Sequence, residues 1–378
     1  MNIVPGSAAY NALTDDQKAQ IAQLWVLKTV KQRYQTPIAF ASAWTPPLYM
    51  KTNTGSVSGQ NFNGLNYSCC STDFANYIAG FVKSYQNEGV NLFGVSPSNE
   101  PENVFSAWPA SYWTASHLGQ FVTNNLRPAL NNQGLNSVKI ISAESAAWGT
   151  ANSFLSSMDK SNVDILAGHG YVEPGDLILG KKGFNQNPTT WNYATGNKPT
   201  WVTEASDDGG TYDASMTEGL KLATTMHKFL ANCSVNVYVY WLGMLAFQNN
   251  EALICTKSDG TLEFPKTYDV MGNYSRYIKP GYYRFGASVS NNGNLLVSAY
   301  KNPTTGAFSI VVTNTGSVPV NCALGLTGFT SSTITGYVTS AASTAHWAAT
   351  APIAANSNGS FTAQVPAYSV VTYTGVSN

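Results

Sequence analysis

The chain has 378 residues, of which 43% are hydrophobic, so it can bury a large core in one barrel or in two domains. Its formal net charge is zero and only 11% of its residues are charged, which excludes the basic surface that nucleic acid or an anionic membrane requires. Gly, Ser, Asn and Thr take the place of charged residues and aromatic residues reach 12%, a composition that suits an exported protein acting on neutral polymers.

The first half of the chain alternates predicted helices and strands. Thr14-Asp15-Asp16-Gln17 is a capping box, so a helix is expected to begin at Thr14. An apolar run at 37–42 predicts a strand. The next helix is expected to be capped by Ser71 or Thr72 and to end at Gly89.

The alternation continues to about residue 241. Strands are predicted at 37–42, 92–96, 138–143, 163–168, 199–203 and 235–241, with helices near 111–126 and 213–230 between them. Six strands separated by helices predict a parallel β/α arrangement. After Gly281 the short strands at 295–300, 308–312 and 369–373 predict an all-β domain. We therefore expect a catalytic β/α domain over 1–280 and a β-sandwich over 281–378.

Two glutamates each end a strand-like run and are the candidate catalytic residues. Glu100 follows the strand near 92–96 in Asn99-Glu100-Pro101, and Glu204 ends Trp201-Val202-Thr203-Glu204. The carboxyl ends of parallel strands share one face of a barrel, so acids 104 positions apart in sequence can meet there. Retaining glycosidases use two such carboxyls, one as nucleophile and one as acid/base with a raised pKa.

Other residues near strand ends are candidates for holding a sugar. These substrate-binding candidates are Trp44, Asn99, Trp113, His169, Tyr171, Tyr240 and Trp241. Asn99 can bond a sugar hydroxyl, and tryptophan rings offer flat apolar faces. Taken singly, His169 is more often a core histidine and each tryptophan more often packs. Glu144 also ends a strand and is a rival carboxylate, with a structural or supporting role expected.

The five cysteines and the remaining motifs point to no cofactor. No Cys-x-x-Cys pair is present, so neither a zinc site nor any other metal site is expected. Two alternatives remain for Cys233 and Cys255: a disulfide between them, or buried free thiols. No phosphate loop, dinucleotide fingerprint or Gly-x-Ser-x-Gly elbow occurs.

The sequence resembles glycoside hydrolase family 30 in several motifs. Phe40 to Lys51, with Ala43-Trp44-Thr45-Pro46-Pro47 at its centre, looks like that family's third-strand motif. Val95 to Pro101 looks like its acid/base strand, and Trp201 to Glu204 like its nucleophile strand. The resemblance implies a (β/α)8 TIM barrel fused to a β-sandwich and retention of configuration. It makes Glu100 the acid/base and Glu204 the nucleophile.

Two departures from the family pattern qualify the expectation. Only about 36 residues precede Pro37, so the first two β/α units are expected to be absent or abbreviated, leaving an incomplete barrel. Its open edge would be covered by the N-terminal segment of a monomer or by a homodimer partner. The loop at 242–249 has no Arg or Lys, so no strong dependence on glucuronate side groups is expected.

The expected activity is an endo-β-1,4-xylanase, with endo-β-1,6-glucanase or galactanase as the alternative. A second alternative is a carbohydrate-binding protein that has lost turnover. The first residues lack the basic and apolar regions of a signal peptide, yet the composition favours a secreted enzyme.

Overall fold

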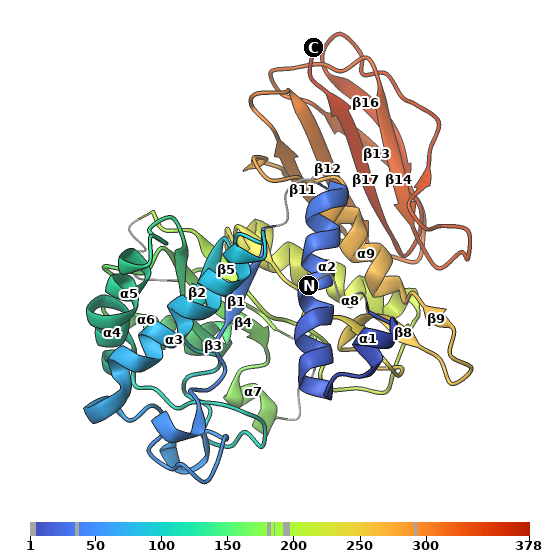
Figure 1. Cartoon of the computed structure of the whole chain (residues 1–378). Coiled ribbons are helices and arrows are strands. Elements are labelled where there is room, and N and C mark those ends of the chain that lie inside the picture. Colours follow the sequence, from blue (N-terminus) through green and yellow to red (C-terminus); the bar gives the residue numbers. More distant parts are fainter. Residues whose placement is uncertain (1–4, 35–37, 180–182, 185, 192–196, 291–292) are drawn as a thin grey trace. The chain divides into compact units, whose positions relative to one another are not determined.

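The computed structural model describes residues 5–34, 38–179, 183–184, 186–191, 197–290 and 293–378. The chain divides into two compact units. Unit 1 comprises Met1–His169 and Asn192–Trp201, and unit 2 comprises Gly170–Trp191 and Val202–Asn378. Figure 1 colours the elements of both by their position in the sequence.

Two helices open unit 1: α1 (Ala8–Asn11) and the longer α2 (Asp15–Tyr34). The predicted capping box is confirmed, because the Gln17 amide donates to Thr14 Oγ1 at 3.3 Å and the Thr14 amide donates to Gln17 Oε1 at 3.1 Å. These reciprocal bonds satisfy amide groups that the first turn of a helix leaves free.

Helix α3 (Tyr67–Asn87) begins five to six residues earlier than the sequence suggested. The predicted caps Ser71 and Thr72 are wrong, because the Asn66 side chain accepts the Ser68 amide at 3.3 Å and occupies the N-cap position. Asn is as good an N-cap as Ser. Gly89 follows the end of the helix with φ +82°, the left-handed conformation that glycine adopts without strain.

The six predicted β/α strands are confirmed and form one curled sheet in chain order. They are β1 (Phe40–Ser42), β2 (Gly94–Ser96), β3 (Lys139–Ala147), β4 (Ile165–Tyr171), β5 (Thr200–Val202) and β6 (Val237–Tyr238). β1 pairs with β2, and β2 with β3, in parallel. The sheet is half of a TIM barrel.

Helices and short helical turns lie between these strands and, for the last helix, after them. They are the 3-10 turns η1 (Leu48–Met50) and η2 (Gln60–Phe62), α4 (Ala115–Phe121), the π-helical turn η3 (Val122–Leu126), α5 (Arg127–Asn132), α6 (Trp148–Ser156), α7 (Pro174–Ile178), α8 (Met216–His227), the π-helical turn η4 (Lys228–Asn232) and α9 (Lys266–Ser275). In unit 2, α8 and α9 bury Leu222, Met226 and Val270 in one cluster that also contains Tyr240. That packing fixes α8 beside the loop that follows β5.

The remaining strands of unit 2 are antiparallel with one exception. β7 (Leu242–Leu245), β8 (Ala252–Thr256) and β9 (Leu262–Glu263) form a small sheet that the sequence did not indicate, with β7 and β8 parallel. The predicted all-β region is confirmed by β10 (Tyr283–Phe285), β11 (Leu295–Lys301), β12 (Ala307–Asn314), β13 (Val320–Gly325), β14 (Ile334–Thr339), β15 (Ala348–Ala349), β16 (Ser360–Val365) and β17 (Ser369–Val376).

These C-terminal strands make a side domain with its own core. One sheet has the order β10-β11-β12-β17-β14-β15, and β13 pairs with β16. Phe308, Val312, Phe361 and Val371 are buried together between them. The boundary between residues 280 and 281 stays a prediction.

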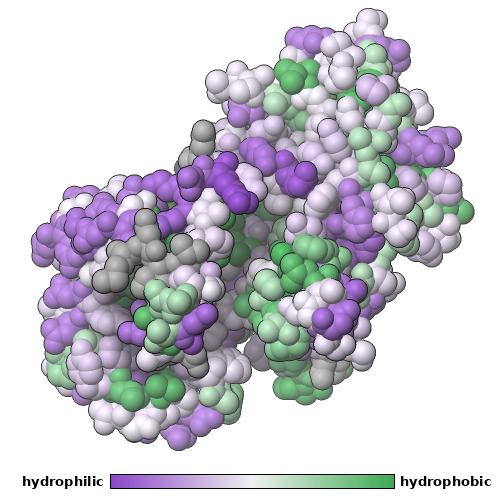
Figure 2. Space-filling model, turned by 45° about the vertical axis from the view of Figure 1, so that its right-hand side comes forward, coloured by the Kyte–Doolittle hydropathy of each residue, from purple (hydrophilic) through white to green (hydrophobic). Residues whose placement is uncertain are grey.

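The surface agrees with the composition. Figure 2 shows a visible face made mostly of pale residues of intermediate hydropathy, with separate purple and green patches. Within the described residues no helix combines the length and the apolar character that a membrane span needs.

The cysteines resolve the alternatives that the sequence left open. Cys233 and Cys255 are buried free thiols, as is Cys322. The adjacent Cys69 and Cys70, at the start of α3, are joined by a disulfide. No Cys233–Cys255 disulfide therefore cross-links the region of β6 to β8.

Candidate active site

Glu100 lies in the loop that follows β2. Pro97 has no amide hydrogen and cannot extend the ladder, so the chain turns directly after Ser96. The Glu100 amide donates to the Glu144 carbonyl at 2.8 Å, and Ser98 Oγ donates to the Ala143 carbonyl at 3.0 Å. These bonds hold Glu100 at φ +46°, a left-handed conformation that is strained for a residue with a side chain.

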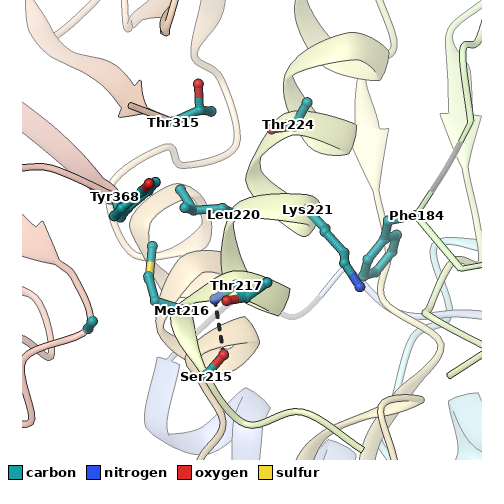
Figure 3. Close-up of a pocket in the computed structure, with 10 residues that line it drawn as sticks. Phe184, Ser215, Met216, Thr217, Leu220, Lys221, Thr224, Thr315 and Tyr368 are labelled. Carbon is teal, nitrogen blue, oxygen red and sulfur yellow. Dashed lines mark hydrogen bonds between the residues drawn. The ribbon is translucent and has the colours of Figure 1, made fainter. Parts of the chain in front are cut away.

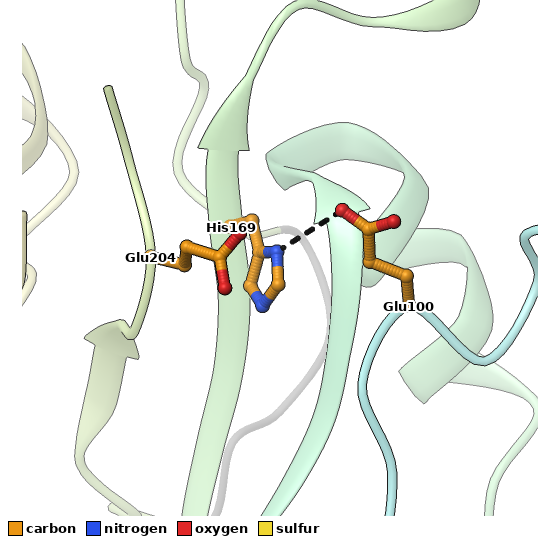
Figure 4. Close-up of side chains that lie close together, drawn as sticks. All are labelled: Glu100, His169 and Glu204. Carbon is orange, nitrogen blue, oxygen red and sulfur yellow. Dashed lines mark ion pairs between the residues drawn. The ribbon is translucent and has the colours of Figure 1, made fainter. Parts of the chain in front are cut away.

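The Glu100 carboxylate has two polar partners within unit 1. Asn103 Nδ2 donates to Oε2 at 2.9 Å, and His169 Nδ1 lies 3.5 Å from Oε1. Figure 4 shows the side chains of Glu100 and His169, and its dashed line marks the ion pair between them. All three residues belong to the β2 loop or to β4, so the sheet positions the carboxylate.

The pKa of Glu100 was expected to be raised, and that prediction is wrong. Burial raises the pKa of this carboxyl, but the hydrogen bond and charge of His169 and the amide of Asn103 lower it, and the net pKa lies below the ordinary value. Burial and a nearby second carboxylate, taken alone, would raise the pKa. His169 and Asn103 together outweigh the burial.

Glu204 lies two residues beyond the end of β5 and is bound on both sides by backbone hydrogen bonds in unit 2. The Gly170 amide donates to the Glu204 carbonyl at 2.7 Å, and the Trp241 amide donates to the Ala205 carbonyl at 2.9 Å. The Tyr171 hydroxyl donates to Glu204 Oε1 at 2.8 Å. A hydrogen bond of this kind favours the ionised carboxylate, the form that a nucleophile needs.

Strand β4 contributes to the surroundings of both acids. His169 pairs with Glu100, and Tyr171 donates to Glu204. His169 and Tyr171 are two positions apart, so their side chains point to the same face of the sheet. Each candidate acid therefore has a polar side-chain partner within its own unit.

The other predicted binding residues fall into two groups. Trp44, in the loop after β1, and Trp241, after β6, are partly exposed, and Asn99 is buried beside Glu100. Trp113 is a correction: it is 1% exposed and packs against Phe74 and Phe121, so no ring face is open to a sugar.

Tyr240 is also corrected from a binding residue to a packing residue. Its ring is buried against Phe184, and its hydroxyl donates to the Asn250 carbonyl at 2.5 Å. The sequence could not separate these rings from Trp44, because burial depends on partners that lie far along the chain.

Sequence reasoning missed several polar residues near Glu100. Asn103 follows Glu100 by three positions, the spacing of a turn that brings the two residues together, and this was the signal in the sequence. Glu102 accepts the Ala146 amide at 2.8 Å, and burial, with Glu100 nearby, raises its pKa. The rival Glu144 is buried and accepts a hydrogen bond from Ser42 Oγ at 2.6 Å.

A half-barrel of parallel strands with carboxylates just past the strand ends, joined to a β side domain, defines a class of α/β-barrel glycoside hydrolases. The chain belongs to glycosyl hydrolase family 30: the family's TIM-barrel domain matches residues 8–238. It is therefore a glycosidase by family.

Known proteins of this family resemble the chain at low identity. The glucuronoxylanase XynC of Bacillus subtilis (strain 168) is 26% identical over 346 residues, which cover 89% of this chain and 73% of that protein. An endo-1,6-beta-D-glucanase of Neurospora crassa is 24% identical over 243 residues, covering 64% of this chain and 50% of that protein.

One solved structure is similar over nearly the whole chain. The family 30 subfamily 8 xylanase Xyn30A of Clostridium acetobutylicum is 28% identical, with a TM-score of 0.76, and the match covers 99% of this chain and 87% of that one.

Proposed function

We propose that this protein is a retaining endo-glycoside hydrolase that cuts β-1,4-xylan, with Glu204 as the nucleophile and Glu100 as the acid/base. The observation that carries the proposal is that each candidate acid follows a strand of the family's barrel domain and has a polar partner in its own unit: His169 for Glu100 in unit 1 and Tyr171 for Glu204 in unit 2.

The first step would form a covalent glycosyl-enzyme. The ionised Glu204 attacks the anomeric carbon, and the bond to the leaving oxygen breaks while Glu100 gives that oxygen a proton. The Tyr171 hydroxyl donates to Oε1 of Glu204, and such a hydrogen bond favours the ionised form. In the second step, Glu100 takes a proton from water, the water oxygen attacks the same carbon, and Glu204 departs as a carboxylate. Two inversions give net retention.

Replacement of Glu204 by Gln tests the enzyme against the binding alternative. The variant keeps the size of the side chain but cannot form the ester, so we expect turnover of xylan to fall by at least about 10³-fold. Glu251→Gln, a surface change in the same unit, serves as the control. If the wild type is already inert but retains polysaccharide on an affinity gel, the chain is a carbohydrate-binding protein instead.

The relatives support two polysaccharides. The Bacillus relative is named as a glucuronoxylanase and the Neurospora relative as an endo-1,6-glucanase. Xylan is our first choice, because the glucuronoxylanase and the xylanase structure are 26% and 28% identical to the chain, against 24% for the Neurospora glucanase. Product profiles on xylan, a β-1,6-glucan and arabinogalactan separate xylanase, glucanase and galactanase action.

We further propose that cleavage does not depend on glucuronate groups. The segment 242–249, which contains β7 (Leu242–Leu245), carries no Arg or Lys that could grip a carboxylate. Decorated and undecorated xylan should then give similar initial rates. A product series set by the position of glucuronate would contradict this proposal.

The assembly and location are also proposals. β1 and β6 are the outer strands of the six-stranded sheet, and uncovered strand edges promote association. We propose either a monomer whose N-terminal segment covers an edge or a homodimer in which a second copy does so, which light scattering coupled to gel filtration would distinguish. We also propose that the protein is secreted, which its recovery from culture medium would test.

A further inference from the structure

Asp207 lies three residues after Glu204, in the loop that leaves β5. It is buried, and its Oδ1 accepts the Gly209 amide at 3.0 Å. A Cβ on Gly183 would lie 2.2 Å from the same oxygen, and Gly183 has φ +63°. Only glycine fits there, so the carboxylate of Asp207 is enclosed by backbone on that side.

Helix α8 presents two charged groups to Asp207. Glu218 is 1% exposed, and Lys221 Nζ lies 2.8 Å from its Oε2 and 3.8 Å from Asp207 Oδ2. Figure 3 shows Lys221 extending from α8 toward Phe184, in the wall of a cavity of about 600 Å³. Lys221 therefore bridges the two carboxylates from their solvent side.

One oxygen of this cluster has no conventional partner. Among the described residues, Glu218 Oε1 is buried and accepts no hydrogen bond from an N–H or hydroxyl group. Among the described residues, two carboxylates and one ammonium leave an excess negative charge in this buried space, which is costly. A single proton held between Asp207 and Glu218 would satisfy the oxygen and cancel the charge.

We propose that Asp207 and Glu218 share one proton and act as positioning residues, which fasten the loop after Glu204 to helix α8 and so limit turnover when the proton is lost. The proposal rests on the proposed role of Glu204 as nucleophile. Loss of the proton leaves two facing carboxylates for one lysine. Their repulsion would displace the loop and, three residues earlier, the nucleophile.

The electrostatics give the proposal a pH window. Burial, the hydrogen bond to Asp207 and the charge of Asp207 raise the pKa of Glu218 from 4.5 to about 7, while Lys221 opposes the rise. Tyr240 packs near both acids, and Asp213 adds negative charge near Lys221. Because the folded-state pKa is raised, the stabilisation is complete below pH 4.5 and is lost as the pH rises to about 7.

The first measurement is independent of catalysis: the melting temperature of the whole chain between pH 4 and 9. Glu218→Gln keeps an N–H donor for Asp207 but cannot titrate. We expect the melting temperature of the wild type to fall by about 5 °C more than that of the variant between pH 4.5 and 7. Asp259→Asn removes an exposed acid from the same unit and should behave as the wild type does.

The second measurement isolates the nucleophile. A dinitrophenyl β-xylobioside has a leaving group that departs without a proton, so the acid role of Glu100 is not required. We expect the kcat of the wild type on this substrate to fall about tenfold per pH unit above pH 7. Glu218→Gln and Asp207→Asn should keep kcat constant to pH 9, with KM unchanged.

The outcomes separate the inference from the function it rests on. An inert wild type with the expected melting profiles refutes the proposed function and keeps the shared proton. Parallel melting profiles of wild type and Glu218→Gln refute the shared proton. A flattened melting profile with the alkaline fall of kcat unchanged refutes the positioning role. If Glu218→Gln does not fold, Asp207→Asn decides each point in the same way.

Discussion

The Nδ1 atom of His169 lies 3.5 Å from Oε1 of Glu100, and both side chains are buried. This distance is too long for a strong hydrogen bond but within the range of an ion pair. The pair exists only while the imidazole is protonated and the carboxyl is ionised. A charged His169 therefore favours the ionised form of Glu100.

Replacing His169 by Asn should raise the pKa of Glu100. The variant removes the positive charge that lowers this pKa, so the burial of the carboxyl acts unopposed by charge. A general acid with a higher pKa stays protonated to higher pH, so the alkaline limb of kcat/KM on xylan should move upward. The exposed His117→Asn is the control, and an unmoved limb in His169→Asn would contradict the coupling.

Replacing Asn103 by Ala should also raise the pKa of Glu100, but by less than replacing His169 does. The Asn103 amide donates to Glu100 Oε2 at 2.9 Å, and it lowers the pKa of Glu100 less than His169 does. The alkaline limb should shift upward by less than in His169→Asn. Asn103→Asp should shift the alkaline limb further upward than Asn103→Ala does, because a second carboxylate then faces Glu100. A larger shift in Asn103→Ala than in His169→Asn would show that the order of the two effects is wrong.

The fold was predictable wherever local pattern decides structure. Apolar runs ending in Glu100 and Glu204 located β2 and β5, and the capping box located α2. The start of α3 was not predictable in the same way, because Asn66 and Ser71 are both good caps and the local sequence does not choose between them.

The candidate site was predictable for its acids but not for their electrostatics. The pKa of Glu100 depends on His169, whose position relative to Glu100 is set by the sheet and not by sequence spacing. The burial of Trp113 depends on Phe74 of α3, about forty residues away. Contacts between distant elements are the part of the site that a single sequence leaves open.

Replacing Lys51 by Met should destabilise unit 1. The Lys51 ammonium is 1% exposed and donates to Thr45 Oγ1 and to the carbonyls of Val57, Ser58 and Ala110 at 2.5–3.0 Å. A methionine fills the space but leaves buried carbonyls without a donor, at a cost of about 1–3 kcal/mol for each.

Urea unfolding of Lys51→Met checks this expectation, with the exposed Lys257→Met as the matched control. The midpoint should fall in the first variant and stay unchanged in the second. An equally stable Lys51→Met would mean that the surrounding loop finds other donors.

Replacing Trp113 by Ala tests its reassignment from sugar platform to core residue. The ring centroid lies 5.2 Å from that of Phe121 and 5.6 Å from that of Tyr67, and the side chain is 1% exposed. Removing a buried ring of this size should lower the free energy of unfolding by about 3–5 kcal/mol. The KM for xylan of the remaining folded protein should not change.

The neighbouring Phe105 provides the control, because it is 88% exposed and Phe105→Ala should leave stability unchanged. Urea unfolding and KM are measured on both variants at a temperature where each is folded. A Trp113→Ala protein of wild-type stability with a KM raised tenfold would restore Trp113 as a sugar-binding residue. A loss of stability at constant KM places it in the core, where its contacts with α3 and α4 hold the loop that carries Glu100.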